Sequence, residues 1–184
     1  MIILDTIFRD LKVIEPKIFE DSRGYFFESY NEKVFEENGL KYDWVQENES
    51  MSNKGVLRGL HYQLSPFSQT KLVRVVRGSV IDIVVDIRKS SPTFSKIFSI
   101  ELTAQNKKQL LVPKGFAHGF VVLEDNTIFS YKCDELYNKE SERGINPFDK
   151  SLSIDWGISK ELAILSEKDL NSPSFTNAEY NFSF

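Results

Sequence analysis

Short stretches of alternating hydrophobic and polar residues, separated by turn residues, occupy most of the chain. From residue 44 to residue 133 they recur at intervals of roughly 8–12 residues, a spacing typical of all-β sandwiches and barrels. Helical periodicity is sparse. Apart from one short stretch at 32–38, it is confined to 159–165 and 166–170. The pattern therefore predicts an all-β fold with a few short helices, mainly in the C-terminal region.

The first 30 residues are predicted to form short strands. A turn at Asp21–Gly24 separates two aromatic-rich segments, as expected for a hairpin. Asn31 is placed to cap the short helix at 32–38, and Gly39 is placed to end it in a left-handed conformation.

The strand predicted from residue 44 has no clearly apolar face. Gln46, Asn48 and Ser50 share one face, while the opposite face carries Glu47 and Glu49. Two interpretations fit this pattern equally well. The strand is either a solvated edge strand, or its polar face lines a binding cavity.

The next segment, residues 56–64, reads VLRGLHYQL. Arg58 and His61 differ in parity, so a regular strand would point them to opposite faces. A bulge near Gly59 would bring both side chains to one side. Residues 71–88 then predict a hairpin with its turn at Gly78-Ser79.

Composition limits the class of protein. At 184 residues and 41% hydrophobic, the chain is expected to be one domain, 1–184, with a sizeable core. A net charge of −4 argues against nucleic-acid binding, although an arginine cluster can still bind phosphate. Cys133 is the single cysteine, which favours a reducing, cytoplasmic setting. We expect no signal peptide and no membrane span.

His61 is the best candidate for a general base, because imidazole titrates near neutrality. The commoner role of a lone histidine is structural, as a hydrogen-bonded side chain. Lys71 follows after a loop that holds Pro66, and is expected beside His61 on a paired strand. Its ammonium would suit a developing oxyanion, whereas its ordinary role would be that of a solvated strand lysine.

A metal site is an alternative. The segment PKGFAH, residues 113–118, matches the second cupin motif, in which the histidine binds a metal. The first motif would begin with two histidines around one residue, but here Gln63 replaces the second. His61, His118 and a carboxylate would make a three-ligand site. No carboxylate can be assigned to it from the sequence, so this alternative ranks second.

Two tyrosines flank Cys133. Tyr131 and Tyr137 are candidates for a general acid acting opposite a base. Without further context, packing roles as core or rim aromatics are the favoured interpretation.

Five segments together resemble a known family. They are GVLRGLHYQ, KLVRVVRGSVIDIVVDIRKSSPTF, NKKQLLVPKGFAHGFVVL, YKCDELYNKESERGI and ILSEKD. The chain resembles the dTDP-4-dehydrorhamnose 3,5-epimerases, which are cupin-type sugar-nucleotide epimerases. The resemblance covers about Phe19 to Asp169 and its motifs are long and ordered.

The resemblance implies a cupin-type jelly roll, also called a double-stranded β-helix, that works as a homodimer with exchanged N-terminal strands. It implies an isomerase of surface carbohydrate biosynthesis that uses no metal or cofactor and acts on a nucleotide-linked 4-keto-6-deoxy sugar. His61 would be the base, oriented by Asp169. Lys71 would stabilise the enolate, and Tyr131 would return a proton from the opposite face.

The resemblance also implies a set of substrate contacts. The nucleotide-diphosphate contacts would be Arg23, Gln46, Asn48 and Arg58, with Phe19, Phe26 and Glu28 nearby. Tyr137 and His118 would line the pocket, and Asp82 would support Lys71 or His61 from behind.

The chain departs from the common family pattern at residues 49–51, at 134–138 and in the tail after Asp169. We expect substrate identity to be decided around residues 46–51 and 134–143. The nucleotide of the substrate could be dTDP, GDP or CDP, and its sugar could be a hexose or a heptose. The inverted carbon could be C3, C5 or both. A non-catalytic sugar-nucleotide binding module is a further alternative, although binding alone needs no base and acid.

Overall fold

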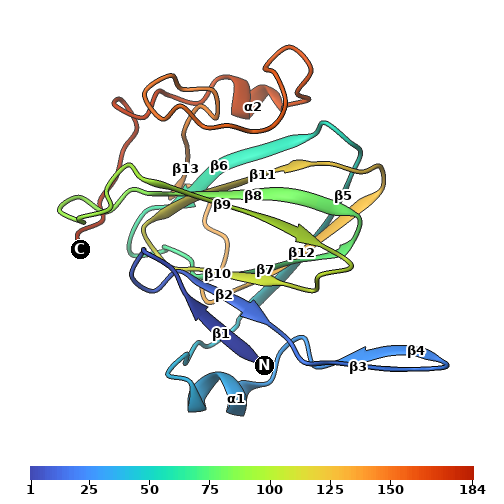
Figure 1. Ribbon diagram of the computed structural model, residues 1–184. Helices are drawn as coiled ribbons and strands as arrows, with labels where there is room; N and C mark the ends of the chain where they lie inside the picture. The colour runs from blue at the N-terminus through green and yellow to red at the C-terminus, as the bar shows by residue number, and fades with distance from the viewer.

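The computed structural model describes all residues from Met1 to Phe184, and they form two facing antiparallel β-sheets with a projecting two-stranded arm (Figure 1). The six-stranded sheet has, in spatial order, β1 (Ile2–Asp5), β2 (Lys12–Glu15), β10 (Gln109–Val112), β7 (Lys71–Arg77), β12 (Thr127–Cys133) and β5 (Gln46–Ser52). The five-stranded sheet has β13 (Glu142–Gly144), β6 (Leu57–Gln63), β11 (Phe116–Val122), β8 (Ser79–Asp86) and β9 (Ile97–Thr103). This arrangement confirms the expected all-β jelly roll.

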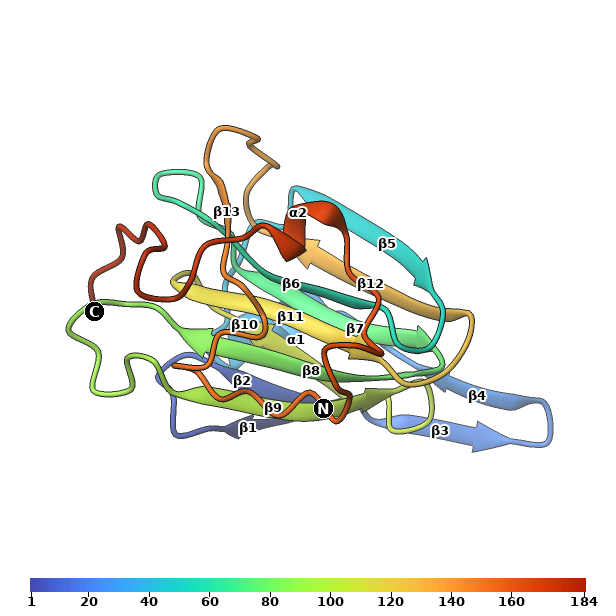
Figure 2. The same ribbon diagram turned by 90° about the horizontal axis from the view of Figure 1, so that it is seen from above.

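The core lies between the two sheets, and a second apolar layer lies outside one of them. On β8, Val80 and Val84 belong to the cluster between the sheets, while Ile83 and Val85 belong to the outer cluster. The C-terminal part of the chain, which includes the buried Trp156, covers this outer face (Figure 2). Both faces of β8 are therefore covered, one by the core between the sheets and the other by the C-terminal part of the chain.

Aromatic stacking spans the gap between the sheets. Phe120 of β11 stacks on Phe129 of β12, with ring centroids 4.1 Å apart and ring planes 18° apart. These strands belong to different sheets, so the two rings set part of the spacing between them.

The predicted hairpin at residues 71–88 is wrong in its pairing. Both strands form where expected, but β7 lies in the six-stranded sheet and β8 in the five-stranded sheet. Gly78 has a φ of 78°, and a Cβ there would lie 2.2 Å from Thr127 Oγ1. The turn therefore carries the chain from one sheet to the other. Alternation identifies strands and turns, but it does not identify the neighbour with which a strand pairs.

Two short helices are present, one in each half of the chain. Asn31 caps α1 (Glu32–Glu37) through a side-chain bond to Val34 N, as predicted, and Gly39 adopts a φ of 76°. The helix α2 (Glu167–Leu170) is a single turn. Residues 159–165 form a turn instead of a helix, so the expected C-terminal bias is not observed. Neither helix is long enough to span a membrane.

The arm consists of β3 (Ile18–Asp21) and β4 (Gly24–Phe27), joined by the predicted turn. It extends away from both sheets (Figure 1). Phe19, Tyr25 and Phe26 are more than half exposed on it, at 52%, 57% and 66%. Large exposed aromatic side chains on a projecting element mark a surface that another molecule can cover.

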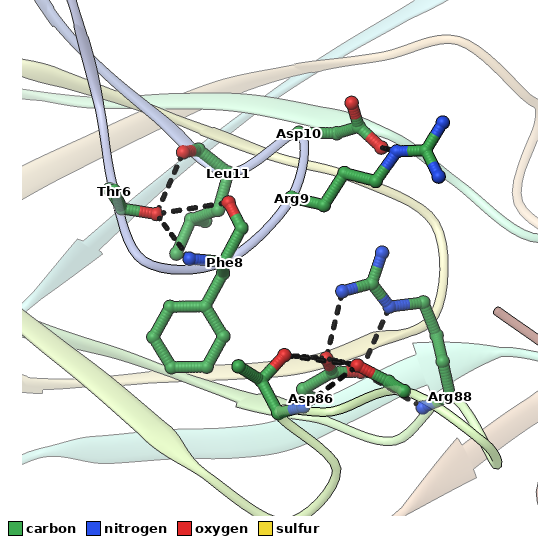
Figure 3. A network of polar contacts seen from close by, with 9 residues as sticks. Thr6, Phe8, Arg9, Asp10, Leu11, Asp86 and Arg88 are labelled. Carbon is green, nitrogen blue, oxygen red and sulfur yellow. Dashed lines mark hydrogen bonds and ion pairs between the residues drawn. The ribbon is translucent and has the colours of Figure 1, made fainter.

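Figure 3 shows polar contacts in the β1–β2 loop and at the corner after β8. Thr6 Oγ1 accepts a hydrogen bond from Phe8 N and donates to Leu11 O, so that the β1–β2 loop turns Phe8 into the core. Nearby, the Asp86 carboxylate accepts bonds of 2.9 and 2.8 Å from the Arg88 guanidinium. This buried ion pair fixes the corner after β8 and lies outside the cavity described next.

Candidate active site

A bulge in β6 places the first two candidate residues in one cavity. The pairing of β6 with β11 shifts register beside Gly59, which has a φ of 124°. A Cβ on Gly59 would lie 2.5 Å from the Cα of Gly119 on β11, so only glycine fits there. Beyond the bulge, Arg58 and His61 both line the same cavity, as predicted.

His61 is paired with the carboxylate of Asp169. Asp169 Oδ1 lies 2.5 Å from His61 Nε2, and Asp169 is the buried residue of the short helix α2. Burial acts to raise the pKa of Asp169, but the hydrogen bond and charge of His61 and the bond from Ser166 outweigh it and lower the pKa. Asp169 is thus held ionised, in a position to stabilise a protonated imidazole.

Lys71 and Tyr131 face His61 from the opposite sheet. The expectation that Lys71 sits on a strand paired with that of His61 is wrong, because β7 pairs with β10 and β12. The two side chains meet across the sandwich instead, and both line the cavity. Lys71 Nζ lies 5.6 Å from the Tyr131 ring centroid and has no hydrogen-bond or ion-pair partner. Burial lowers the pKa of Lys71, an effect that Cys133, Glu142 and Asp82 partly offset.

The cavity has two adjoining parts of about 360 and 320 Å³. His61, Lys71 and Tyr131 line both of them. The first part has an apolar wall formed by Val56, Phe120, Ile164 and Leu165. The second part is mainly polar and includes Gln46, Asn48, Gln63, Gln69, Tyr137 and Glu142. A base, a cation and a phenol therefore converge where a partly apolar chamber meets a polar one.

His118 lines the cavity wall, as predicted, but its partner is unexpected. Its Nε2 lies 3.0 and 2.9 Å from the two carboxylate oxygens of Asp82. Asp82 was expected to support Lys71 or His61 from behind. Its hydrogen-bond partner is instead His118, and it supports Lys71 only through its charge, which acts to raise the pKa of Lys71. The reason is that Asp82 lies on β8 opposite Phe120 of β11, two residues from His118. Burial raises the pKa of Asp82, although His118 and Lys71 oppose the shift.

The cupin motif histidines are direct cross-strand neighbours, His61 on β6 and His118 on β11. The Nε2 atom of each is hydrogen-bonded to its own aspartate. No group of three histidine, cysteine, aspartate or glutamate side chains comes together as a metal site. In place of the second motif histidine, Gln63 donates to the backbone oxygens of Phe67 and Leu136.

Both interpretations of the unusual polar strand hold. β5 is an edge strand, with Glu47, Glu49 and Met51 exposed. Its other face lines the cavity through Gln46 and Asn48. Gln46 Oε1 accepts a 2.8 Å bond from Tyr137 N, which connects this strand to the segment 134–141.

Two charged residues of the site, Glu142 and Lys168, were not singled out in the sequence. Glu142 accepts a 2.8 Å bond from the Tyr137 hydroxyl and forms a 2.5 Å ion pair with Lys168. Lys168 lines the first part of the cavity and Glu142 the second. The only available signal was the position of Lys168 next to Asp169.

Four predicted substrate contacts lie away from this cavity. Phe19, Arg23 and Phe26 are on the arm formed by β3 and β4, and Arg23 pairs with Asp21 at 2.6 Å. Glu28 follows the arm and accepts a bond from Asn31 Nδ2. Within one chain, none of the four lines the cavity.

Comparison with known proteins identifies the relatives of this chain. The family model for dTDP-4-dehydrorhamnose 3,5-epimerase matches residues 5–177. The chain is 54% identical over 181 residues to the Shigella flexneri dTDP-4-dehydrorhamnose 3,5-epimerase, covering 98% of this chain and 99% of that protein.

Solved structures agree with the sequence comparison. The Elizabethkingia anophelis dTDP-4-dehydrorhamnose 3,5-epimerase superposes with a TM-score of 0.91 at 53% identity, covering 96% of this chain and 97% of that one. A Legionella pneumophila dTDP-6-deoxy-D-glucose-3,5-epimerase, solved with dTDP-4-keto-L-rhamnose, gives 0.90 at 47% identity, covering 95% and 93%. Sequence, fold and near-complete coverage agree, and the chain belongs to the dTDP-4-dehydrorhamnose 3,5-epimerase family.

Proposed function

We propose that this chain inverts both C3 and C5 of a dTDP-linked 4-keto-6-deoxy sugar in surface carbohydrate biosynthesis. One observation carries the proposal: the His61–Asp169 pair faces Lys71 and Tyr131 across a single cavity, from opposing sheets. A ketone at C4 acidifies the protons on C3 and C5. Inversion then needs a base on one side of the ring, an acid on the other, and a cation for the enolate oxygen.

In the first step His61 removes the proton from C3 or C5. The electron pair of the broken C–H bond moves into the enolate, and the negative charge settles on the C4 oxygen. Asp169 stabilises the imidazolium that forms. The unpaired ammonium of Lys71 stabilises the enolate oxygen. Lys71 supplies this charge itself, so the proposed reaction uses no metal or cofactor.

In the second step Tyr131 donates its hydroxyl proton to the opposite face of the same carbon, where the electron pair of the enolate forms the new C–H bond. His61 then releases its proton to solvent and the Tyr131 phenolate takes one from solvent, so that the second carbon can be inverted in the same way. Burial, chiefly, raises the pKa of Tyr131, so the phenol is protonated at neutral pH and available as an acid. Because Tyr131 lies on the six-stranded sheet and His61 on the five-stranded sheet, the returning proton arrives from the other side of the ring.

The nucleotide diphosphate is proposed to lie at the boundary of the two chambers, between Arg58 of the first and the polar groups of the second. Arg58 faces the cavity, its guanidinium oriented by bonds of 3.2 and 3.1 Å to Ser52 Oγ. Gln46, Asn48 and Tyr137 line the adjoining chamber. His118, held by Asp82, would contact the sugar. The groups that line the cavity come from most of the chain, from residue 46 to residue 169, which supports a single domain of residues 1–184.

We further propose a homodimer in which the arm of each chain reaches the cavity of the other. The exposed aromatic residues of the arm support this arrangement, as does the absence from the cavity of four predicted contacts. Phe19, Arg23, Phe26 and Glu28 of the partner subunit would then complete the nucleotide site. The single, buried Cys133 suits a reducing compartment such as the cytoplasm.

Solvent exchange in deuterium oxide tests the activity. We expect the protein to place deuterium at C3 and C5 of the dTDP-linked 4-keto-6-deoxy sugar, faster than with the GDP- or CDP-linked sugars. The absence of deuterium from every sugar in the panel would contradict the proposal. Substrate binding without exchange would favour the non-catalytic alternative, and loss of activity with a chelator, restored by stoichiometric metal, would favour the metal-dependent one.

A further inference from the structure

Glu142 connects the two parts of the cavity. It is the first residue of β13, where it lies opposite Gln63, and Gly144 of the same strand lies opposite His61. Its Oε1 is 2.5 Å from Lys168 Nζ, and its Oε2 accepts a 2.8 Å bond from the Tyr137 hydroxyl. One carboxylate therefore binds α2 on one side and the rim of the polar chamber on the other.

The helix α2 depends on contacts from outside itself. It has four residues, too few to form a stable helix alone, and among them only Asp169 is buried. Backbone hydrogen bonds fix the chain on both sides of α2. Before it, Ile164 N donates to Gly55 O, and after it, Asn146 N donates to Pro173 O. Between those two anchors, polar side chains reach across from α2 to β6 and β13, namely those of Lys168 and Asp169.

We propose that Glu142 is a positioning residue: by binding Lys168, it holds α2 so that Asp169 stays aligned with the His61 ring. Lys168 and Asp169 are adjacent, so a shift of one moves the other. The inference rests on the proposed role of His61 as the base. It adds a residue that acts on the base through another side chain and does not itself contact the reacting carbon.

The charge of Glu142 fits this role. Burial acts to raise its pKa, but the Lys168 and Tyr137 hydrogen bonds, with the charges of Lys168 and His61, outweigh that effect and lower the pKa. The ion pair is therefore intact at neutral pH. The other ionisable groups that line the cavity with His61 are Arg58 and Tyr62 on β6, Lys71 on β7, His118 on β11, Tyr131 on β12, Tyr137 after β12, and Lys168 and Asp169 on α2.

A double-mutant cycle tests the path through Asp169. Glu142→Gln keeps the shape of the side chain and removes its charge. We expect kcat for C–H exchange to fall about tenfold in the wild-type background, and by less than about twofold in an Asp169→Asn background. An equal fall in both backgrounds, or no fall in the wild type, would overturn the proposal.

The pH profile of Lys168→Met separates positioning from direct electrostatics. Loss of the Lys168 anchor loosens the contact that stabilises protonated His61, so the acid limb of kcat should move to lower pH. Glu142→Gln should move it the same way. If Lys168 acted only through its positive charge, its removal would favour protonation of His61 and move the limb to higher pH, which would refute the inference.

Controls distinguish failure of this inference from other failures. Glu179→Gln breaks the 2.8 Å ion pair of the neighbouring strand residue, Arg143, and should leave kcat and the pH profile unchanged. Lys168→Arg keeps the ion pair and should retain kcat within about twofold, provided that thermal melting shows every variant to be folded. Loss of activity in Lys168→Arg as large as that in Lys168→Met would count against positioning. No exchange by the wild type would instead contradict the proposed function.

Discussion

Asp169 Oδ1 lies 2.5 Å from Nε2 of His61, although the two residues are 108 positions apart in the chain. The contact is made by a single helical turn, whose N-cap Ser166 also accepts a bond from the backbone N of Asp169. A buried carboxylate in this position supports the imidazolium form of the base, which is the form created by proton abstraction.

Asp169→Asn should therefore reduce kcat for exchange by at least about 100-fold while changing KM much less, since the amide keeps the shape and loses the charge. Steady-state kinetics on the dTDP-linked 4-keto sugar measure this. A fall in kcat of less than a few-fold would show that His61 needs no ionised partner.

The same carboxylate predicts a stability change in acid. The pKa of Asp169 is lowered in the folded protein below its ordinary value of 3.8, despite burial. Its stabilisation is thus complete above the unfolded value and is lost as the pH falls through the lower, folded value. Urea unfolding should show that the free-energy difference between wild type and Asp169→Asn shrinks below pH 3.8. A difference that stays constant into that range would contradict the assignment.

His61→Ala and Tyr131→Phe should both abolish inversion, but for different reasons. Without His61 no proton leaves the sugar, so solvent deuterium is not incorporated. Without the Tyr131 hydroxyl the enolate can still form, and exchange without inversion can persist. Nuclear magnetic resonance of the recovered sugar distinguishes the two outcomes. Exchange at the wild-type rate in His61→Ala would show that the base is another residue.

Lys71→Met should stabilise the fold and inactivate the enzyme. Burial lowers the pKa of Lys71, which means that charging it in the folded state is costly, and no anion is bonded to it. The cost is complete below the lowered, folded pKa and disappears only as the pH rises through the ordinary value of 10.5, so at neutral pH the variant should gain about 1 kcal/mol in free energy of unfolding. Lys132→Met is the matched control: Lys132 lies on the adjacent strand and pairs with Glu47 at 2.8 Å, and its loss should not stabilise the protein.

Mixed dimers test the exchange of arms. A chain with His61→Ala lacks a base but has an intact arm, whereas a chain without residues 18–27 lacks the arm but has its base. Each alone should be inactive, and co-expression should restore roughly a quarter of wild-type activity, because half of the randomly formed dimers contain one complete site. Co-expressed chains that form heterodimers and remain inactive would place the function of the arm within its own chain.

The sequence predicted the strands well because alternation is a local property. The bulge at Gly59 and the polar face of β5 were also visible, since each breaks the expected alternation. Pairing was not predictable in the same way. Gly78 has the composition of a hairpin turn, yet it carries the chain between sheets, because whether a turn crosses the core depends on residues far away in the chain.

The candidate site was predicted unevenly for the same reason. His61 and Lys71 stood out from their own segment, but Asp169 entered only through the family resemblance. Glu142 and Lys168 look like ordinary charged surface residues in the sequence, and their ion pair exists only because β13 and α2 meet above β6. The hydrogen bond of Asp82 to His118 was not foreseen, because alternation does not show which neighbouring strand supplies a contact.

Phe129 links the interior packing to the chemistry. It touches neither part of the cavity, yet its ring is stacked between the sheets on Phe120. The base stands on one sheet, while the acid and the cation stand on the other. The thickness of the core is thus also the width of the gap that a sugar ring must bridge. A change in side-chain volume at Phe129 would therefore change the distance between His61 and Tyr131. It would also change which ring carbons both residues can reach, without replacing any residue that lines the cavity.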